Sequence, residues 1–360
     1  MTLKKLKALH SNIKALRNYN NRRVVLDNPP TFVWIEPTNH CNLKCIMCPN
    51  GAGMVRTEKG YLDYGLYVKI IDEIGSFAST IVLALGGESL LHPKFIDMVK
   101  YADKKRIRVC LNTNATMLNE EMSRLLLGSG LSNVSFAFDG FNKKTYESIR
   151  VGGDFEKTLN NILGFLRIRK KLKSKKPYTV LSILKIGTEG CKKNEKDAFL
   201  KQFDGLIDEI RLRDVSSWGN TFKDSDKFTH DRYDVLWTPC SRLWSSICVA
   251  WNGDVMPCIY NANHEYVVGN VKESRLLDIW NSGKMVNLRK AMIDETYLDL
   301  SPLCENCVVL GTPPIVGIPS GIRLTLADSI TNIVGYRFES STLYLANKFH
   351  KKEFSSVRVG

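Results

Sequence analysis

Short apolar runs rich in β-branched residues alternate with helical stretches from Val33 to Asp214, and this alternation restricts the fold more than any other feature. Strands connected in this way run parallel and are joined by right-handed crossovers. Six such units in about 180 residues are too few to close an eight-stranded barrel. The sequence therefore predicts an α/β fold with an open six-stranded barrel, whose chemistry lies at the carboxyl ends of the strands. Strands are expected near 33–38, 80–85, 107–112, 132–138, 178–185 and 207–214, and helices near 65–76, 94–104, 118–127, 154–172 and 193–203.

The chain is expected to divide into several segments. They are a basic amphipathic helix over 1–30, the barrel over 31–214, a polar linker over 215–239, a small domain over 240–308 and a tail over 309–360. In the small domain, residues 247–251 and 255–260 flank an Asn252-Gly253 turn, which predicts a β-hairpin. A helix is expected near 274–293, so the small domain is of the α+β type.

The net charge of +14 is concentrated in two bands of lysine and arginine, within 1–26 and 167–176. Because the rest of the chain is balanced, the bands are typical of solvated helix faces, and no nucleic-acid partner is expected. In the first band, apolar residues recur at helical spacing; they are Leu3, Leu6, Leu9, Ile13 and Leu16. We interpret this segment as a helix packed against the main domain, with membrane association or a transit peptide as the alternative.

The chain contains no apolar run of roughly 18 residues and does not open with the charged, apolar and small segments of a secretory signal. A cytoplasmic protein is therefore expected. Its ten cysteines then lie in a reducing compartment, where clustered thiols are typical of metal ligands or catalytic groups rather than of disulfides.

Cys41, Cys45 and Cys48 follow the first predicted strand with the spacing CxxxCxxC. Three thiolates leave one position open on a tetrahedral zinc ion, and they likewise leave one iron free on a four-iron cluster. A free iron can bind a substrate or a cofactor. His40 could complete a zinc site, but its position next to Cys41 places it poorly for that role.

This loop resembles the cluster-binding motif of the radical S-adenosylmethionine (SAM) superfamily, and further motifs follow in the expected order at the ends of later predicted strands. Gly86, Gly87 and Glu88, after the second strand, resemble the GGE segment whose backbone receives the methionine amino group of SAM. Asn114, after the third strand, resembles the asparagine of the family's TNG motif. The resemblance thus implies SAM contacts at the carboxyl end of the sheet.

Three more residues match family positions for SAM. Asp139, after the fourth strand, resembles a ribose contact, and Arg150 resembles an arginine that helps to hold the cofactor's carboxylate. Met47 stands where the family usually has an aromatic residue against adenine, and a thioether can make a similar contact. Ala137 and Ala115 replace the serine and glycine of two family motifs, so the ribose and backbone contacts there must differ in detail.

Cys240, Cys258, Cys304 and Cys307 form a second group, contributed by the predicted hairpin and a distant CxxC. By chemistry alone, such a closed set could hold zinc or a four-iron cluster. The spacing resembles the SPASM auxiliary domain of the same superfamily and its shortened form, twitch. Because no cysteine follows Cys307, the resemblance implies one auxiliary cluster. The remaining cysteines are expected to be buried thiols rather than ligands: Cys110, Cys191 and Cys248.

Together the motifs imply a partial (β/α)6 radical SAM barrel followed by a small SPASM/twitch domain, with SAM and two [4Fe–4S] clusters as cofactors. A reduced first cluster would pass an electron to SAM, and the resulting 5'-deoxyadenosyl radical would abstract hydrogen from a substrate. A closed second cluster would accept or relay an electron, which makes net oxidation the expected outcome. Such a reaction also requires an electron donor such as flavodoxin or ferredoxin.

The substrate is expected to be a sugar, an aminocyclitol or a similar small polar molecule, because the roughly 32 residues before the first strand are too few for a folded leader-recognition module. Arg213 and Asp214 end the sixth predicted strand and are candidates for substrate contact or proton removal, with a salt bridge between them as the alternative. Two other interpretations stay open: a radical maturase of peptides or proteins, and a non-catalytic zinc or electron-transfer protein.

Overall fold

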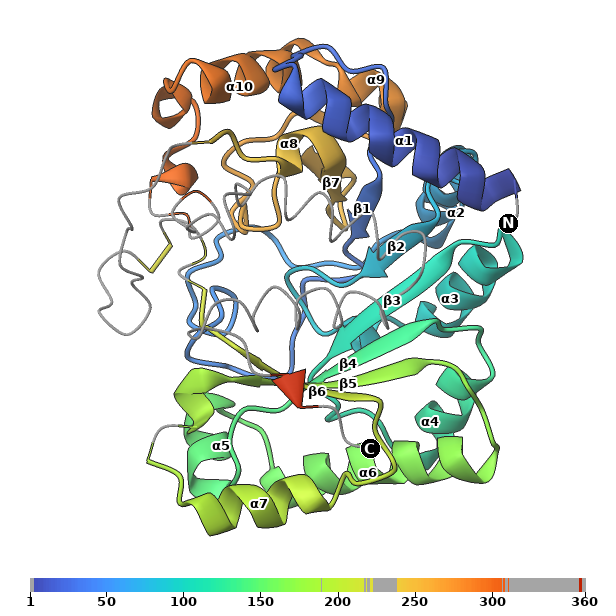
Figure 1. Ribbon diagram of the computed structural model, residues 1–360, viewed down its shortest axis with the longest axis vertical. Coiled ribbons are helices and arrows are strands. Elements are labelled where there is room, and N and C mark those ends of the chain that lie inside the picture. The colour runs from blue at the N-terminus through green and yellow to red at the C-terminus, as the bar shows by residue number, and fades with distance from the viewer. Residues whose placement is uncertain are drawn as a thin grey trace.

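The computed structural model describes residues 3–188, 190–216, 218, 221–222, 238–305, 307, 310 and 356–357. Across these residues the strands form one sheet in the order β10-β6-β5-β4-β3-β2-β1-β7-β8-β9. Figure 1 shows the central strands fanning across the molecule, with α3, α4 and α6 on the outside of the sheet and with α1, α9 and α10 at the opposite end. The carboxyl ends of the strands meet on one side, which is where the site lies.

The six barrel strands are parallel and adjacent in chain order, which confirms the predicted open barrel. Their bounds are β1 Phe32–Ile35, β2 Thr80–Leu83, β3 Arg108–Thr113, β4 Asn133–Ala137, β5 Tyr178–Leu184 and β6 Glu209–Arg213. Every residue of β2 is buried. Parallel strands are covered on both faces, which is why they appear in the sequence as continuous apolar runs rather than as alternating ones.

The predicted barrel helices are confirmed within a few residues at each end. They are α2 Tyr64–Ile74, α3 Phe95–Lys104, α4 Glu120–Leu127, α6 Phe155–Lys171 and α7 Lys193–Lys201. A further helix, α5 (Lys143–Ile149), was not predicted, because seven residues are too few for a periodic signal. Asn142 begins it by accepting a hydrogen bond from the Thr145 N–H. Two short 3-10 helices, η1 Ser89–Leu91 and η2 Lys185–Thr188, follow β2 and β5.

The small C-terminal unit is joined to the barrel sheet rather than linked to it by a loop alone. After α8 (Arg242–Ser245), strand β7 (Ser246–Val249) pairs in parallel with β1, and β8 (Asp254–Met256) and β9 (Gly269–Asn270) follow antiparallel. The predicted hairpin is confirmed, with Gly253 in its turn at a φ of +93°. Its second strand is shorter than expected, because Pro257 cannot donate a backbone hydrogen bond.

The single helix predicted near 274–293 is wrong, because the structure has two helices there, α9 (Leu276–Trp280) and α10 (Gly283–Ile293). Ser282 caps α10 by accepting from the Met285 N–H. The Asn281 side chain leaves the helix direction to pair with both backbone groups of Leu26, at 2.9 Å each. Two 3-10 helices, η3 Tyr297–Asp299 and η4 Pro302–Cys304, complete this unit.

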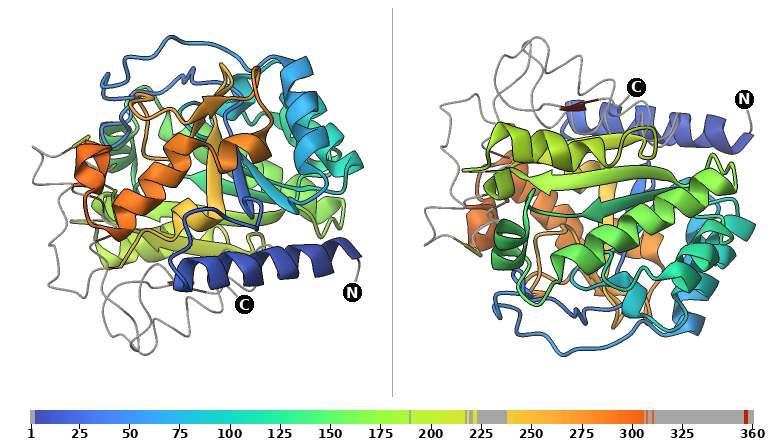
Figure 2. Two further views of the ribbon diagram at one scale, coloured as in Figure 1. Left: turned by 90° about the horizontal axis from the view of Figure 1, so that it is seen from above. Right: turned by 90° about the horizontal axis from the view of Figure 1, so that it is seen from below.

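The N-terminal helix α1 (Leu3–Asn20) packs against the small unit, as preferred, but through a different face from the one predicted. Leu6 and Ile13 of the expected apolar face are 45% and 57% exposed, whereas Ala8 and Ala15 are buried. Tyr19 donates to the carbonyl of Pro239 at 2.8 Å, and small alanine side chains let the helix approach closely. The deep blue helix runs beside orange α9 and α10 in Figure 2.

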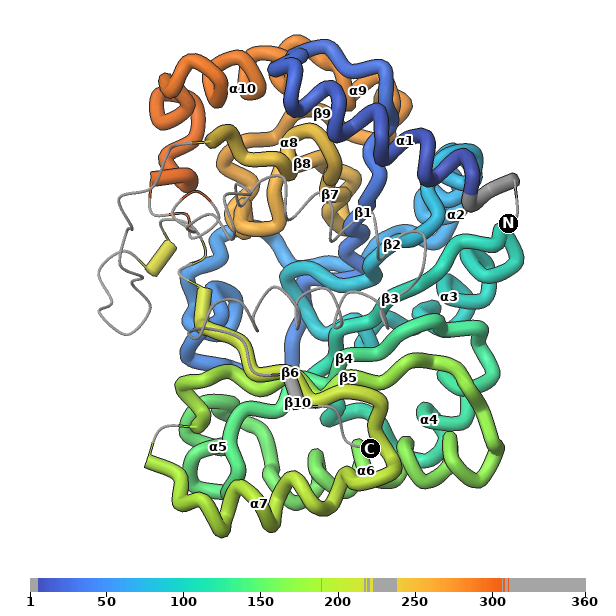
Figure 3. The backbone as a smooth tube through the Cα atoms, viewed as in Figure 1, coloured from blue at the N-terminus to red at the C-terminus, as the bar shows by residue number. Residues whose placement is uncertain are grey.

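Among the described residues, no helix has the length and apolar character needed to cross a membrane. Strand β10 (Ser356–Val357) pairs antiparallel with β6 at the edge of the sheet, as the tube in Figure 3 also shows. Most of the predicted linker 215–239 and of the predicted tail 309–360 lies outside the described residues.

Candidate active site between two cysteine groups

The first cysteine group, Cys41, Cys45 and Cys48, lies on a loop after the carboxyl end of β1. Backbone hydrogen bonds tie the loop to the end of α5: Lys44 donates to Val151 at 2.8 Å and Ile46 to Ile149 at 3.1 Å. Cys41 is exposed, Cys45 is buried and Cys48 is half-buried. The fixed loop therefore presents its thiols over a range of depths at the mouth of the barrel.

The three thiols raise one another's pKa values. Burial raises the pKa of Cys45 to about 11; the Arg150 guanidinium opposes this shift, and Cys48 and Cys41 add to it. One guanidinium N–H of Arg150 donates to the Cys45 sulfur at 3.7 Å. Thiolates that repel one another in a buried loop are the donor set that an iron–sulfur cluster satisfies. In the described part of the chain, no three His, Cys, Asp or Glu side chains stand in metal-site geometry, so the ligand assignment stays a prediction.

The Gly86-Gly87 segment packs flat against the backbone that leads into the cysteine loop. A Cβ at Gly87 would lie closer than 3.0 Å to the carbonyls of Thr38 and His40, and a Cβ at Gly86 would lie 2.6 Å from Glu36 Oε1. The Glu88 N–H donates to the His40 carbonyl at 2.9 Å. Glycine is therefore required here by close backbone approach, and the segment fixes the second strand against the loop.

The Glu88 carboxylate is used inside the protein. It is 3% exposed and accepts from the Thr113 hydroxyl at 2.8 Å and from the Asn114 N–H at 2.7 Å. Burial raises the pKa of Glu88, and these donors partly oppose the shift. The Asn114 side chain in turn donates to Asn42 of the cysteine loop at 3.0 Å. Glu88 and Asn114 thus join the ends of β2 and β3 to the first cysteine group.

Asp139 and Arg150 form one buried unit. Asp139 Oδ2 accepts from Arg150 at 2.7 Å from Nε and at 2.6 Å from a terminal nitrogen, while Oδ1 accepts from the Leu184 N–H at 2.7 Å. Burial lowers the pKa of Arg150, but Asp139 and Cys45 outweigh it and raise the pKa above the usual range. The pair therefore stays ionised and places a cation against the first cysteine group.

The other predicted residues occupy two separate places. Met47 is 6% exposed in an apolar cluster with Leu43 and Ile149, and its carbonyl accepts from the Trp218 indole at 2.9 Å. Arg213 and Asp214 lie at the carboxyl end of β6, as expected from the barrel. Asp214 forms its ion pair with Lys185 at 2.6 Å.

The second cysteine group, Cys240, Cys258, Cys304 and Cys307, comes together from the start of α8, the end of the hairpin and η4. Burial first, and then the neighbouring thiols, raises the pKa of Cys240 and of Cys304 to about 12 each. Cys258 and Cys304 act on Cys240, and Cys307 and Cys258 act on Cys304. The four thiols therefore share one buried neighbourhood, which fits a closed four-thiolate site.

Two of the cysteines expected to be buried thiols are buried, namely Cys110 and Cys248. The expectation for Cys191 is wrong, because it is half-buried in the loop before α7. There its thiol donates to the Lys192 carbonyl at 3.5 Å and to Glu195 at 3.6 Å. The sequence around Cys191 is polar and offers no apolar elements that could cover the thiol.

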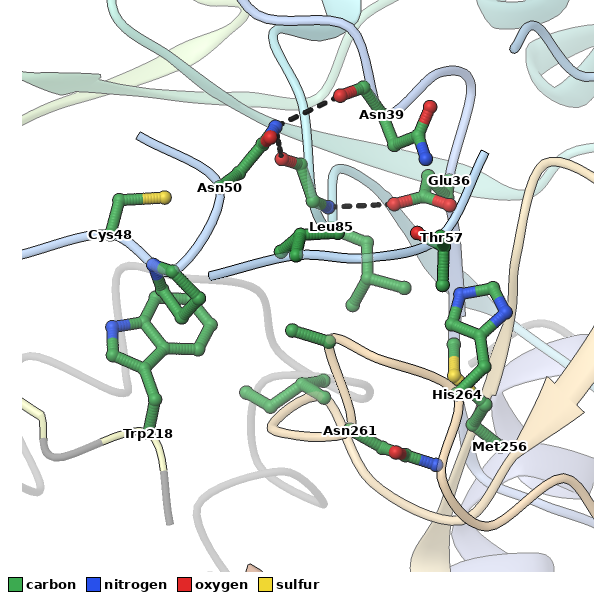
Figure 4. Close-up of a pocket in the computed structure, with 15 residues that line it drawn as sticks. Glu36, Asn39, Cys48, Asn50, Thr57, Leu85, Trp218, Met256, Asn261 and His264 are labelled. Carbon is green, nitrogen blue, oxygen red and sulfur yellow. Dashed lines mark hydrogen bonds between the residues drawn. The ribbon is translucent and has the colours of Figure 1, made fainter. Parts of the chain in front are cut away.

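A pocket lies between the cysteine loop and the small unit, with an empty volume of about 450 Å³ that includes its open mouth. Cys48 and Gly86 line it from the barrel, and Met256 and His264 line it from the hairpin and the loop after it. Figure 4 shows Cys48 and Trp218 at one side of the pocket and Met256 and His264 at the other. The volume falls within the range typical of small-molecule sites.

Glu36 is the pocket residue that sequence reasoning missed most clearly. It follows β1 and is 3% exposed, and its two oxygens accept from the Gly86 N–H at 2.9 Å and from the Trp251 N–H at 3.2 Å. Burial raises the pKa of Glu36, and the two N–H donors oppose the shift. Because β1, β2 and β7 end together, this carboxylate joins the glycine segment to the hairpin. An acid directly after an apolar strand was the signal that could have marked it.

Two family models match the chain. The Radical SAM superfamily model matches residues 35–174, and the SPASM model, an iron-sulfur cluster-binding domain, matches residues 240–308. The barrel and the two cysteine groups define a radical enzyme with an auxiliary iron–sulfur domain. The chain belongs to the radical SAM superfamily. Its cofactors are accordingly SAM and [4Fe–4S] clusters, the first in the barrel and the auxiliary one in the SPASM region.

Several relatives are similar along most of the chain. The "tungsten-containing aldehyde ferredoxin oxidoreductase cofactor-modifying protein" of Pyrococcus furiosus is 26% identical and covers 77% of this chain and 86% of the relative. The "S-adenosyl-L-methionine-dependent 2-deoxy-scyllo-inosamine dehydrogenase" of Niallia circulans is 24% identical and covers 78% and 94%. The "AdoMet-dependent heme synthase" of Methanosarcina barkeri is 33% identical, but this chain spans only 40% of its length.

Solved structures share the fold. BtrN in complex with AdoMet and 2-DOIA superposes with a TM-score of 0.52 at 21% identity, covering 80% of this chain and 97% of BtrN. SuiB of Streptococcus suis bound to its precursor peptide SuiA gives a TM-score of 0.59 at 14% identity, covering 77% and 69%. At these identities the likeness establishes the architecture of barrel and auxiliary unit.

Proposed function

We propose that this radical SAM enzyme oxidises a hydroxyl-bearing small molecule, such as a sugar or an aminocyclitol, in the pocket between its two cysteine groups. The observation that carries the proposal is the position of that pocket. Cys48 of the first group forms part of one wall, and the segment around Cys258 of the second group, including Met256 and Ile259, forms the other. A substrate held there lies beside the source of the radical and beside an electron acceptor.

The walls of the pocket suit a compact polar molecule. Leu85, Met256 and Ile259 supply apolar surface, and Thr57 and His264 supply polar groups. The Thr57 hydroxyl is buried and has no hydrogen-bond partner in the described part of the chain, so it is available to a substrate hydroxyl. The similarity along most of the chain to a protein named as a 2-deoxy-scyllo-inosamine dehydrogenase also supports this class of substrate.

The proposed ligands of the first cluster are Cys41, Cys45 and Cys48, and those of the auxiliary cluster are Cys240, Cys258, Cys304 and Cys307. When bound, the first cluster and SAM supply a 5'-deoxyadenosyl radical that removes a hydrogen atom. The chain's own residues hold and orient these groups. The residues proposed to position SAM are Met47, Gly86, Gly87, Glu88, Asn114, Asp139 and Arg150. Arg150, held by Asp139, supplies the cation nearest to Cys45.

Arg213 and Asp214, at the carboxyl end of β6, remain candidates for substrate contact on the side of the barrel opposite β1. We propose that a flavodoxin or ferredoxin reduces the first cluster. Exposed Cys41 supports access of such a donor from outside. A reducing compartment, the cytoplasm, suits a chain with this many free thiols.

The proposal is tested with anaerobically reconstituted protein, dithionite, SAM and 2-deoxy-scyllo-inosamine deuterated at its carbinol carbons, with myo-inositol and glucosamine as further probes. We expect deuterium in 5'-deoxyadenosine and one ketone for each 5'-deoxyadenosine formed. Cys48→Ala serves as the inactive control. Deuterium transfer from none of the probes, together with transfer from a labelled peptide, would overturn the small-molecule assignment in favour of a maturase.

A further inference from the structure

His264 is a pocket residue with an unusual backbone. It lies on the loop after Cys258 with a φ of +54°, in the left-handed region that residues other than glycine seldom adopt. Asn261 holds this loop: its side chain accepts from the Glu265 N–H at 2.8 Å and donates to the Tyr266 carbonyl at 2.9 Å. The loop thus keeps a strained residue in place, with its side chain lining the pocket (Figure 4).

Asp254 orients the His264 ring from behind. His264 Nδ1 lies 3.2 Å from Asp254 Oδ2, and the same carboxylate accepts from Asn252 at 2.7 Å and from Asn270 at 3.0 Å. Burial raises the pKa of Asp254, but hydrogen bonds from Asn252, His264 and Asn270 outweigh it and hold the pKa below its usual range. An ionised carboxylate only accepts hydrogen bonds, so Nδ1 carries the proton and Nε2 of the neutral ring keeps its lone pair.

The other polar groups of this wall are poorly suited to take a proton. Both oxygens of Glu36 already accept backbone N–H groups, from Gly86 and Trp251. Thr57 presents a hydroxyl, which can contact a substrate but is a weak base. Among these groups, the imidazole of His264 combines a fixed orientation with a free proton-accepting atom.

We propose that His264 is the catalytic proton acceptor of the oxidation and that Asp254 is its positioning residue; this inference rests on the proposed function. The carbinol C–H bond breaks when its hydrogen atom passes to the SAM-derived radical. The hydroxyl O–H bond then breaks, its proton binds to Nε2 of His264, and a C=O bond forms. The one remaining electron passes to an oxidised iron–sulfur cluster, the auxiliary cluster. The sum is loss of two hydrogen atoms from the alcohol.

The first test measures the His264 tautomer, which does not depend on turnover. In 15N-histidine-labelled protein with both clusters oxidised, the His264 signal is assigned by its loss in His264→Gln. We expect the Nδ1–H tautomer in the wild type, a shift to Nε2–H in Asp254→Asn, and recovery in Asp254→Glu. An Nε2–H tautomer in the wild type would overturn the proposal, whether or not a substrate has been found.

The second test measures chemistry with the deuterated 2-deoxy-scyllo-inosamine probe. In His264→Gln we expect 5'-deoxyadenosine and deuterium transfer within about twofold of wild type, and a ketone yield lower by roughly 100-fold, the usual share of a general base. His10→Gln, on the exposed side of α1, is the matched control. A wild-type ketone yield in His264→Gln refutes the role of His264. No ketone from the wild type marks failure of the proposed function instead, and the tautomer then decides on His264.

Discussion

The two cysteine groups reach similar chemistry by opposite routes. The first lies on one short loop, and its spacing is fixed by a few backbone hydrogen bonds to the end of α5. The second is gathered from α8, the hairpin and η4, and its members are spread from residue 240 to residue 307. The comparison teaches that a local thiol group depends on its loop, whereas a dispersed one depends on the packing of the whole small unit.

The electrostatic surroundings of the two groups differ as well. Arg150 is the chief influence that opposes the rise in the pKa of Cys45, which reaches about 11. In the second group the thiols' mutual effect adds to deeper burial, and the pKa values of Cys240 and Cys304 reach about 12. A bound cluster must therefore supply more of the neutralising charge in the second group, so loss of that cluster should affect the fold of the small unit more strongly.

The largest expected effect comes from replacing Cys41, Cys45 and Cys48 by Ala. Reductive cleavage of SAM should disappear, because no loop remains to hold a cluster with an open iron. Iron content should fall from about eight atoms per chain to about four, leaving the spectrum of the auxiliary cluster. Cys191→Ser, a half-buried thiol outside both groups, is the control. Persistent 5'-deoxyadenosine formation in the triple variant would show that this loop is not catalytic.

The next effect separates electron transfer from structural support in the second group. Cys304→Ala with Cys307→Ala should leave SAM cleavage and hydrogen abstraction intact but reduce ketone yield at least tenfold, because the substrate radical has lost its oxidant. Circular dichroism and limited proteolysis measure whether the small unit remains folded. If a folded variant shown to lack the second cluster gives full ketone yield, that cluster has only a structural role.

Gly87→Ala tests how the first group depends on the glycine segment. The added Cβ meets the carbonyls of Thr38 and His40, which are backbone atoms and cannot rotate away, so the free energy of unfolding should fall by about 3 kcal/mol. Gly164→Ala is the matched control, because a Cβ there meets nothing within 4 Å in helix α6. It should raise stability by up to about 1 kcal/mol. Equal effects in the two variants would contradict the packing argument.

The smallest effect concerns the junction of the two regions. Glu36→Gln keeps the size of the side chain but loses one acceptor, so the N–H of either Gly86 or Trp251 is left without a partner, at a cost of roughly 2 kcal/mol in the free energy of unfolding. Glu121→Gln, exposed on α4, should change nothing measurable. Denaturant unfolding of the two variants gives the comparison, and an unchanged midpoint for Glu36→Gln would exclude a bridging role.

The sequence by itself determined the barrel, because parallel buried strands and their helices leave a signal that depends only on neighbouring residues. Its motifs also marked Cys41, Cys45 and Cys48, since eight consecutive residues suffice to define their loop. The likeness of Gly86 and Gly87 to a known segment was visible too. Their physical necessity, close approach to the backbone of Thr38 and His40, was not.

Tertiary structure alone decided the features that join distant segments. Pairing of β7 with β1 made the small unit an extension of the barrel sheet, and the break at Asn281 followed from its contact with Leu26. The buried face of α1 was set by the space available beside α8 rather than by its own apolar pattern. Glu36 and His264 have no distinctive spacing, because their partners lie on other strands and loops. Such residues acquire a role only when folding removes water and brings those partners within reach.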